Sequence, residues 1–239
     1  MAGAHGRVSA PQPRGSLSEH AYLAIRDRIL RGEIPLGAAL SRRKLAAELH
    51  MSLLPVSEAL QQLESDGVVE SRPRVGTRVC RPTEPEIRER YEVREALESQ
   101  SARLFAERAG TRERHELQSM AEDMDAMFNR CFADGHKDAE FVYAVHSYHS
   151  QLHLKIAEGT GCGALRQAIE KNQVLIFNWL YDVAARRPPL PPRFHRDLIE
   201  NLCQGGPEEA DRAMRQHIRY GLTNVVRAIG PATRQNGVG

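Results

Sequence analysis

The sequence predicts a mainly α-helical protein, with an N-terminal winged helix-turn-helix followed by a C-terminal all-helical bundle. Three observations support this fold class. Residues 40–79 read as two short helices, a tight turn and a compact hairpin rich in basic residues. Residues 85–229 carry apolar side chains at helical spacing, with little strand signal. Aromatic residues make up only 5% of the chain, which argues against an all-β sandwich.

The composition limits the class of protein further. An apolar content of 41% and a charged content of 27% are ordinary for a globular chain, and 239 residues suffice for one large domain or two smaller ones. No apolar run approaches the roughly 18 residues that span a bilayer, and the N-terminus lacks the apolar core of a secretory signal. The four cysteines form no CxxC pair, so we expect reduced thiols in a cytoplasmic protein.

The first 84 residues divide into four predicted segments. Residues 1–16, rich in Gly, Pro and Ser, predict a disordered tail. Residues 17–80 form the winged helix, in which Ser41 and Ser52 are candidate N-caps of the two short helices. Its wing consists of two strands, at 68–71 and 77–79, with Pro73 and Gly76 in the turn between them. Pro82 and Pro85 then break the pattern, which makes residues 81–84 a linker.

The rest of the chain predicts one helical domain, residues 85–229, and a flexible tail, residues 230–239. A bundle of about 150 residues is a normal domain size. Breaks at Gly and Pro divide it into helical segments at 85–109, 112–132, 139–157, 162–185, 193–203 and 208–228.

Two basic clusters lie within the winged helix. One is Arg42, Arg43 and Lys44, and the other contains Arg72, Arg74, Arg78 and Arg81, with no acid between Ser71 and Thr83. Most short charge runs are only solvated faces. Because both clusters frame a helix-turn-helix pattern, we favour contact with DNA phosphates.

The chain resembles the GntR-type bacterial transcription regulators. GEIPLGAALSRRKLAAELHMSLLPVSEALQQLESDGVV and the following VGTRV are similar to the family's winged helix. YEVREALESQSARLFAERA and HRDLIENLCQGGPEEADRAMRQHI resemble the FCD ligand-binding domain of the FadR-like branch. The resemblance implies a homodimer on a pseudo-palindromic DNA operator, with a small metabolite in the helical domain altering DNA binding. A dimer is physically reasonable, since one short recognition helix buries too little surface for specific affinity.

The DNA-reading surface departs from the family pattern. The family usually places Arg, Thr and Arg where this chain has Leu53, Leu54 and Ser57. Arginine reads guanine, whereas leucine can only touch thymine methyl groups. Gly76 in the wing tip matches the family, which places it on the DNA-binding surface. We expect phosphate contacts from Arg42, Arg43, Lys44, Arg72 and Arg74, and base contacts from Ser52, Leu53, Leu54, Ser57 and Gln61. The alternative is a winged helix that has lost DNA binding and serves as a protein-interaction domain.

Three histidines occur within eight residues, at His146, His149 and His153. His149 and His153, four residues apart, point the same way from a helix, a common arrangement for holding a transition metal. The resemblance implies that His195 and His217 complete the site and that His149 replaces an aspartate of the family. Four imidazoles favour Zn²⁺ or Ni²⁺ over Mn²⁺, and we expect binding to weaken below about pH 6 as the histidines protonate. The alternative is histidines of the helix surface or core, with no metal.

Arg94 lies on the apolar side of its predicted helix and needs an anionic partner. That partner is Glu98 or another internal acid or, as the resemblance implies, the carboxylate of a small organic-acid effector beside the metal.

We therefore expect a ligand-responsive transcription regulator and not an enzyme. A metal-dependent enzyme is the second hypothesis, but four protein ligands would leave no open metal position and no acid/base dyad lies nearby. An acyl-CoA sensor is the third.

Overall fold

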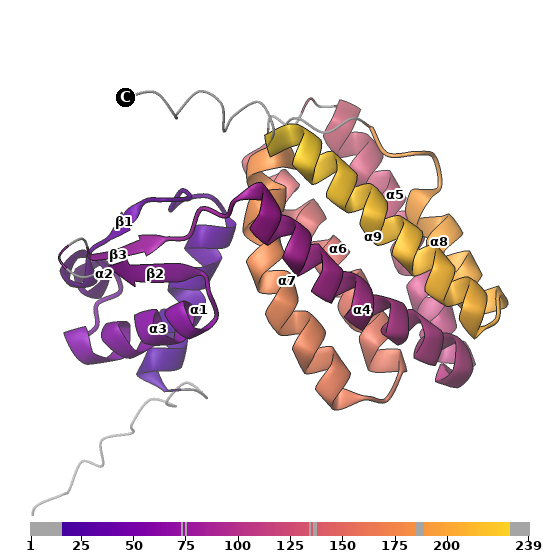
Figure 1. Ribbon diagram of the computed structural model, residues 1–239, viewed down its shortest axis with the longest axis horizontal. Coiled ribbons are helices and arrows are strands. Elements are labelled where there is room, and N and C mark those ends of the chain that lie inside the picture. Colours follow the sequence, from indigo (N-terminus) through magenta and orange to yellow (C-terminus); the bar gives the residue numbers. More distant parts are fainter. Residues whose placement is uncertain are drawn as a thin grey trace, which may run out of the picture.

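The computed structural model describes residues 16–229 apart from 73, 75, 134, 136, 137 and 185–188, and for 174–184 it describes the backbone alone. A winged helix and a bundle of long helices lie side by side (Figure 1), which confirms the predicted fold class. The tails expected at the two ends of the chain fall outside the described residues, Ser16 excepted. Within the described part of the chain, no helix is long and apolar enough to cross a membrane.

The winged helix consists of α1 Leu17–Leu30, β1 Ala39–Leu40, α2 Arg42–Glu48, α3 Leu53–Ser65, β2 Val69–Arg72 and β3 Gly76–Val79. The three strands are antiparallel, in the order β1-β3-β2. Ser41 caps α2 as predicted, because its hydroxyl accepts a hydrogen bond from the Lys44 amide at 3.3 Å. The sequence did not predict β1, since two residues are too few to show an alternating pattern.

The bundle consists of α4 Glu84–Arg108, α5 Thr111–Ala133, α6 Ala139–Gly159, α7 Gly163–Ala184, α8 Phe194–Gln204 and α9 Pro207–Ile229. Helix α4 begins at Glu84 because Thr83 and Glu86 form a capping box, and Pro85 falls in the first turn, where it removes no helical hydrogen bond. Helices α4 and α9 pack along one another (Figure 1). The buried face of α4 includes two charged side chains, Arg94 and Glu98.

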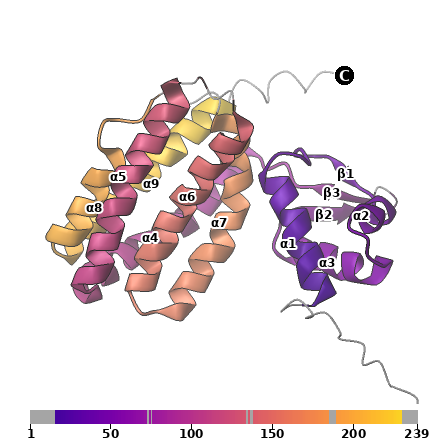
Figure 2. The same ribbon diagram turned by 180° about the vertical axis from the view of Figure 1, so that it is seen from behind.

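The end of α1 touches the start of α6 and thereby joins the two units. The Tyr143 hydroxyl donates a hydrogen bond to Asp27 at 2.6 Å, and Arg31 forms a 2.6 Å ion pair with Glu140. Figure 2 shows α1 next to α6 and α7. Because α6 also carries His149 and His153, a single helix connects the histidine cluster to the winged helix.

Candidate functional site

Three imidazoles meet inside the bundle. Helix α6 places His149 and His153 one turn apart, and α9 brings His217 against them, so that their candidate ligand nitrogens all lie within 4.8 Å of one another. The Nε2 atom of His149 lies 3.1 Å from that of His153 and 3.3 Å from that of His217. A tetrahedral zinc ion with Zn–N bonds of 2.0–2.1 Å needs nitrogens about 3.3–3.4 Å apart. Two edges of the cluster therefore already have the spacing of such a shell.

His195, at the start of α8, is the fourth imidazole. Its ring centroid lies 5.0 Å from that of His149 and 5.5 Å from that of His217. Its Nδ1 contacts Asp125 at 2.9 Å, while its buried Nε2 has no hydrogen-bond partner among the described residues. The structure thus brings the rings of the four histidines named from the sequence near one another, but the nitrogens of His195 lie outside the group that falls within 4.8 Å. His146 is buried elsewhere, edge-on against the ring of Phe128.

Two buried carboxylates orient the imidazoles. Glu98 lies 2.5 Å from Nδ1 of His153, and Asp125 holds Nδ1 of His195. With a carboxylate on Nδ1, each ring carries its proton there and turns the lone pair of Nε2 toward the cluster. Burial alone would raise the pKa of Glu98, but Arg94 and His153 outweigh it and lower that pKa to about 2. Burial likewise opposes the lowered pKa of Asp125, which hydrogen bonds from His195 outweigh.

Burial favours the neutral, metal-binding form of three of the imidazoles, those of His149, His195 and His217. Burial, followed by repulsion from His153 and His195, places the pKa values of His149 and His217 well below the ordinary 6.5. Burial also lowers the pKa of His195, although Asp125 opposes this shift. The expectation that metal binding weakens below about pH 6 assumed ordinary histidines. In the folded protein the onset is expected at lower pH, because the ligands resist protonation.

Arg94 lies beside the cluster and is only 5% exposed. Its Nε donates to Glu98 at 2.8 Å, so the internal acid considered from the sequence is its partner. Its Nη2 lies 3.4 Å from Nε2 of His153, close to the position that a metal ion would take. A cavity of about 30 Å³ adjoins these groups, which is roughly the volume of one water molecule. The described residues that line it are Tyr91, Arg94, Phe128, His149, Leu190, Phe194, His195, His217, Tyr220, Gly221 and Asn224.

The predicted base-reading residues lie along α3, and all except Gln61 are at its start. Leu53 and Leu54 are 50% and 68% exposed, so two adjacent large apolar side chains face solvent. Ser52 precedes the helix without forming a side-chain cap, so its hydroxyl remains available, and Gln61 is exposed as well. The hydroxyl of Ser57 donates to the backbone oxygen of Leu53 at 2.8 Å and retains only its acceptor function for DNA.

The predicted phosphate-binding residues are also on the surface. Arg42, Arg43 and Lys44 are exposed at the start of α2, and Arg72, Arg74 and Gly76 are exposed at the wing. Arg74 and Gly76 have positive φ angles of 65° and 92°, a turn conformation that suits glycine. Arg78 and Arg81, the other two arginines of the second basic cluster, each turn back toward a backbone oxygen. Arg78 donates a hydrogen bond to the backbone oxygen of Gly37, and Arg81 donates one to that of Leu36. The wing therefore exposes to solvent the two arginines that the sequence predicts to bind phosphate, Arg72 and Arg74.

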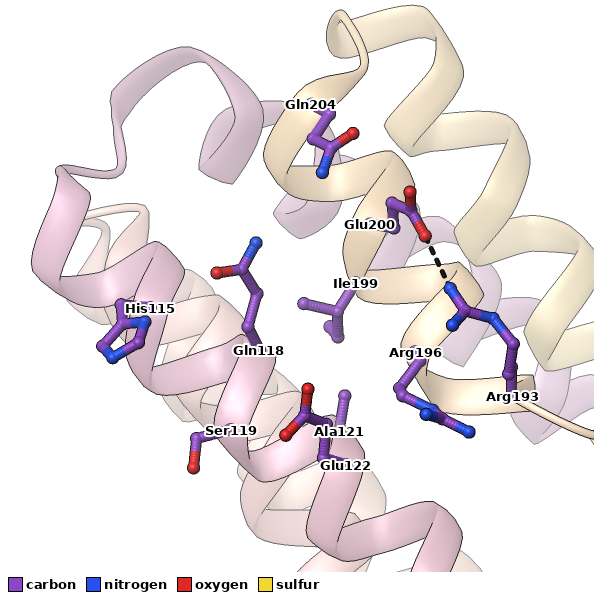
Figure 3. A pocket seen from close by; sticks show the side chains of 10 residues that line it. All are labelled: His115, Gln118, Ser119, Ala121, Glu122, Arg193, Arg196, Ile199, Glu200 and Gln204. Atoms are coloured by element: carbon purple, nitrogen blue, oxygen red, sulfur yellow. Dashed lines mark hydrogen bonds and ion pairs between the residues drawn. The ribbon is translucent and has the colours of Figure 1, made fainter.

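A second hollow, of about 420 Å³, lies between α5 and α8 and was not predicted (Figure 3). Gln118 and Glu122 on α5 face Arg196 and Glu200 on α8 across it. No sequence signal marked it, because exposed polar residues on two helices look like ordinary solvated faces. Arg196 donates to the outer oxygen of Asp125 at 3.2 Å, so one wall of the hollow contacts the carboxylate that orients His195.

Comparison with known proteins agrees with this architecture. Residues 17–79 match the bacterial regulatory proteins of the gntR family, and residues 89–220 match the FCD domain. A probable D-xylose utilization operon transcriptional repressor from Paenarthrobacter nicotinovorans is 30% identical over 194 residues, 80% of each chain. The solved structure of McbR/YncC from E. coli is similar with a TM-score of 0.72 at 21% identity, covering 89% of this chain and 98% of that one. A solved structure of a putative GntR transcriptional regulator from Rhodococcus sp. RHA1 is similar with a TM-score of 0.73 at 20% identity. The match covers 90% of this chain and 99% of that one.

Proposed function

The chain belongs to the GntR family of DNA-binding transcription regulators and carries an FCD domain, and from this premise we propose that a small organic acid, bound beside a metal in that domain, controls its binding to DNA. The observation that carries the proposal is the cluster of three imidazole nitrogens, two of whose separations match a tetrahedral shell, beside the buried guanidinium of Arg94. The family consists of regulators and not of enzymes, so the cluster serves ligand recognition.

In this proposal His149, His153, His195 and His217 hold Zn²⁺ or Ni²⁺, since a shell of neutral imidazoles suits these borderline metals better than Mn²⁺. A bound metal supplies a Lewis acid that can accept a carboxylate oxygen. Glu98 neutralises Arg94, and Asp125 is shared by His195 and Arg196. The two charges of the metal are therefore left without a buried counter-anion among the described residues. An acid that binds both the metal and Arg94 would supply it.

On DNA, we propose a homodimer with one winged helix on each half of a pseudo-palindromic operator. Residues 42–44 and the wing tip anchor the phosphates, and the start of α3 lies in the major groove with Leu53 and Leu54 toward the bases. The exposed ion pairs of Lys44 with Glu48, at 3.8 Å, and of Arg72 with Glu70, at 3.1 Å, are weak enough for phosphates to replace. The operator would thus differ from that of relatives that carry arginine at these positions.

Helix α6 offers a direct route between the two functions. Tyr143 and Glu140 contact α1, and His149 lies six residues beyond Tyr143, about 9 Å along the helix axis. A ligand that moves His149 or His153 moves the surface on which the winged helix rests. The name of the relative from Paenarthrobacter describes a repressor. We propose that this chain also represses, and that the acid releases it from DNA.

The decisive experiment selects binding sites from random DNA with tag-free protein, once after zinc loading and once after chelation. The selected site is then used to measure affinity for wild type and for the double variant His149→Ala/His153→Ala. We expect about one zinc per wild-type chain, none in the double variant, and a DNA affinity that changes with organic acids only in the zinc-loaded wild type. His115→Ala, a change at an exposed histidine of α5, is the matched control and should bind zinc normally. Equal zinc content in all three proteins would refute the metal assignment, and failure to select any DNA would refute the operator proposal.

A further inference from the structure

The cavity beside the imidazoles has a second end, formed by Tyr91 on α4 and Gly221 on α9. A Cβ atom added to Gly221 would lie 3.7 Å from Cε1 and 3.8 Å from the hydroxyl oxygen of Tyr91. Both residues line the cavity together with Arg94. Tyr91 and Arg94 are three residues apart on α4 and so lie on the same side of the helix.

The Tyr91 hydroxyl is a buried group whose proton has no acceptor among the described residues. The side chain is 2% exposed, and the described residues form no hydrogen bond of normal geometry to its hydroxyl. Arg94 nevertheless interacts with it: burial lowers the pKa of that guanidinium, whereas attraction to Glu98 and then to Tyr91, with side-chain hydrogen bonding to both, raises it. Because arginine can only donate, this interaction leaves the hydroxyl proton without an acceptor, which is unfavourable in a buried position. A ligand oxygen in the cavity would accept that proton.

Gly221 lies well inside α9, where glycine weakens a helix relative to alanine. Its φ angle is not among the positive ones, so the backbone does not require glycine here. Nor does packing require it, since 3.7 Å is an ordinary van der Waals distance for an added methyl group. What the missing side chain provides is space, in a cavity that measures only about 30 Å³. A methyl group at this position would occupy much of it.

We propose that Tyr91 and Gly221 select the effector, which is a short carboxylic acid carrying a second oxygen, hydroxyl or carbonyl, next to its carboxylate. This inference rests on the proposed function, which assigns the carboxylate to Arg94 and the metal. The second oxygen hydrogen-bonds to Tyr91, and Gly221 leaves room for the carbon that bears it. The short separation of Tyr91 and Arg94 along α4 limits the distance between the two oxygen groups. Because even a two-carbon acid exceeds the cavity, its entry displaces the half-buried side chain of Leu190 or Phe194.

The test is calorimetric titration of zinc-loaded, full-length protein with glycolate and with acetate, two acids that differ by one hydroxyl. Wild type is expected to bind glycolate at least tenfold more tightly than acetate. Tyr91→Phe should abolish this preference while leaving acetate binding unchanged. Gly221→Ala should weaken binding of both acids more than tenfold, retain full zinc content, and raise the melting temperature because the helix is strengthened.

Two matched controls accompany these variants. Tyr148→Phe removes a hydroxyl on α6 that bonds to Asp123 outside the cavity, and Gly163→Ala adds a methyl group where nothing lies within 4 Å. Both should bind the acids as wild type does. Equal binding of glycolate and acetate by wild type, or wild-type binding by Gly221→Ala, would overturn the inference and leave the proposed function standing. Loss of zinc from Gly221→Ala would show that the glycine supports the metal ligands, and would also overturn it. A wild type that binds neither acid would contradict both the inference and the proposed effector class.

Discussion

Replacing Glu98 with glutamine removes one negative charge from the interior of the bundle and changes the shape of the side chain very little. Glu98 is 2% exposed and lies 2.8 Å from Arg94 and 2.5 Å from His153. At 2.8 Å and an effective dielectric constant of about 20, the attraction to Arg94 is about 6 kcal/mol. Glutamine keeps an oxygen for the hydrogen bond but leaves the guanidinium buried without a counter-charge. Breaking a buried ion pair in this way costs about 3–5 kcal/mol.

For a domain of this size, that loss corresponds to a melting temperature lower by about 10 °C. The same variant should bind zinc about 10–100-fold more weakly, because His153 loses the carboxylate that orients it. Circular dichroism during heating and competition with a zinc chelator measure the two effects. Glu95→Gln is the matched control, since it makes the same change on the same helix at a carboxylate that pairs with Arg215 and Arg219 near the surface. If Glu98→Gln melts and binds zinc as Glu95→Gln does, Glu98 does not support the site as described.

Three further predictions concern pH, DNA and coupling. In the metal-free protein the folded-state pKa values of His149 and His217 are lowered, so unfolding takes up protons below pH 6.5. The free energy of unfolding should therefore fall with decreasing pH, by up to about 1.4 kcal/mol per pH unit for each histidine. Urea titrations between about pH 5 and 7.5 that show no such slope would contradict this prediction. The double variant Arg43→Ala/Arg72→Ala should bind the selected operator more weakly. It should also reduce the slope of log affinity against log salt concentration by about 1.8 per protomer, because two phosphate contacts are lost. An unchanged slope would exclude these residues as phosphate contacts. Tyr143→Phe removes the hydrogen bond to Asp27 and should reduce the difference in DNA affinity between zinc-loaded and metal-free protein; a full difference in this variant would show that α6 is not the route.

The helices of this fold could be predicted from the sequence because the residues that end them, mainly glycine and proline, act on the backbone locally. Gly67, with a φ angle of 71°, ends α3 as expected, and the long helices end within two residues of the predicted segments. Likewise, the pairing of His149 with His153 follows from helical spacing alone. His195 and His217 came from resemblance to the family, since nothing in their immediate neighbourhood marks them.

The supporting carboxylates were harder to recognise. Glu98 was considered only as a partner of Arg94, and its contact with His153 depends on how α4 packs against α6. Asp125 was missed, although an acid on the buried side of α5, between Met124 and Phe128, is a signal that could have been noticed. The lowered pKa values of the imidazoles could not be anticipated either, because burial is a property of the whole bundle. Periodicity shows which face of a helix is apolar but not which polar groups will meet there.

The exposed leucines at the start of α3 have a consequence for the chemical state of the DNA. A leucine in the major groove distinguishes bases by their methyl groups, and thymine is the only unmodified base that carries one there. Cytosine methylated at C5 presents a methyl group at the equivalent position. An operator read by Leu53 and Leu54 would therefore respond to cytosine methylation, which would strengthen contacts at some positions and create new sites at others. Arginine at these positions would instead seek the acceptors of guanine, and the methyl groups of the DNA would carry little information for it.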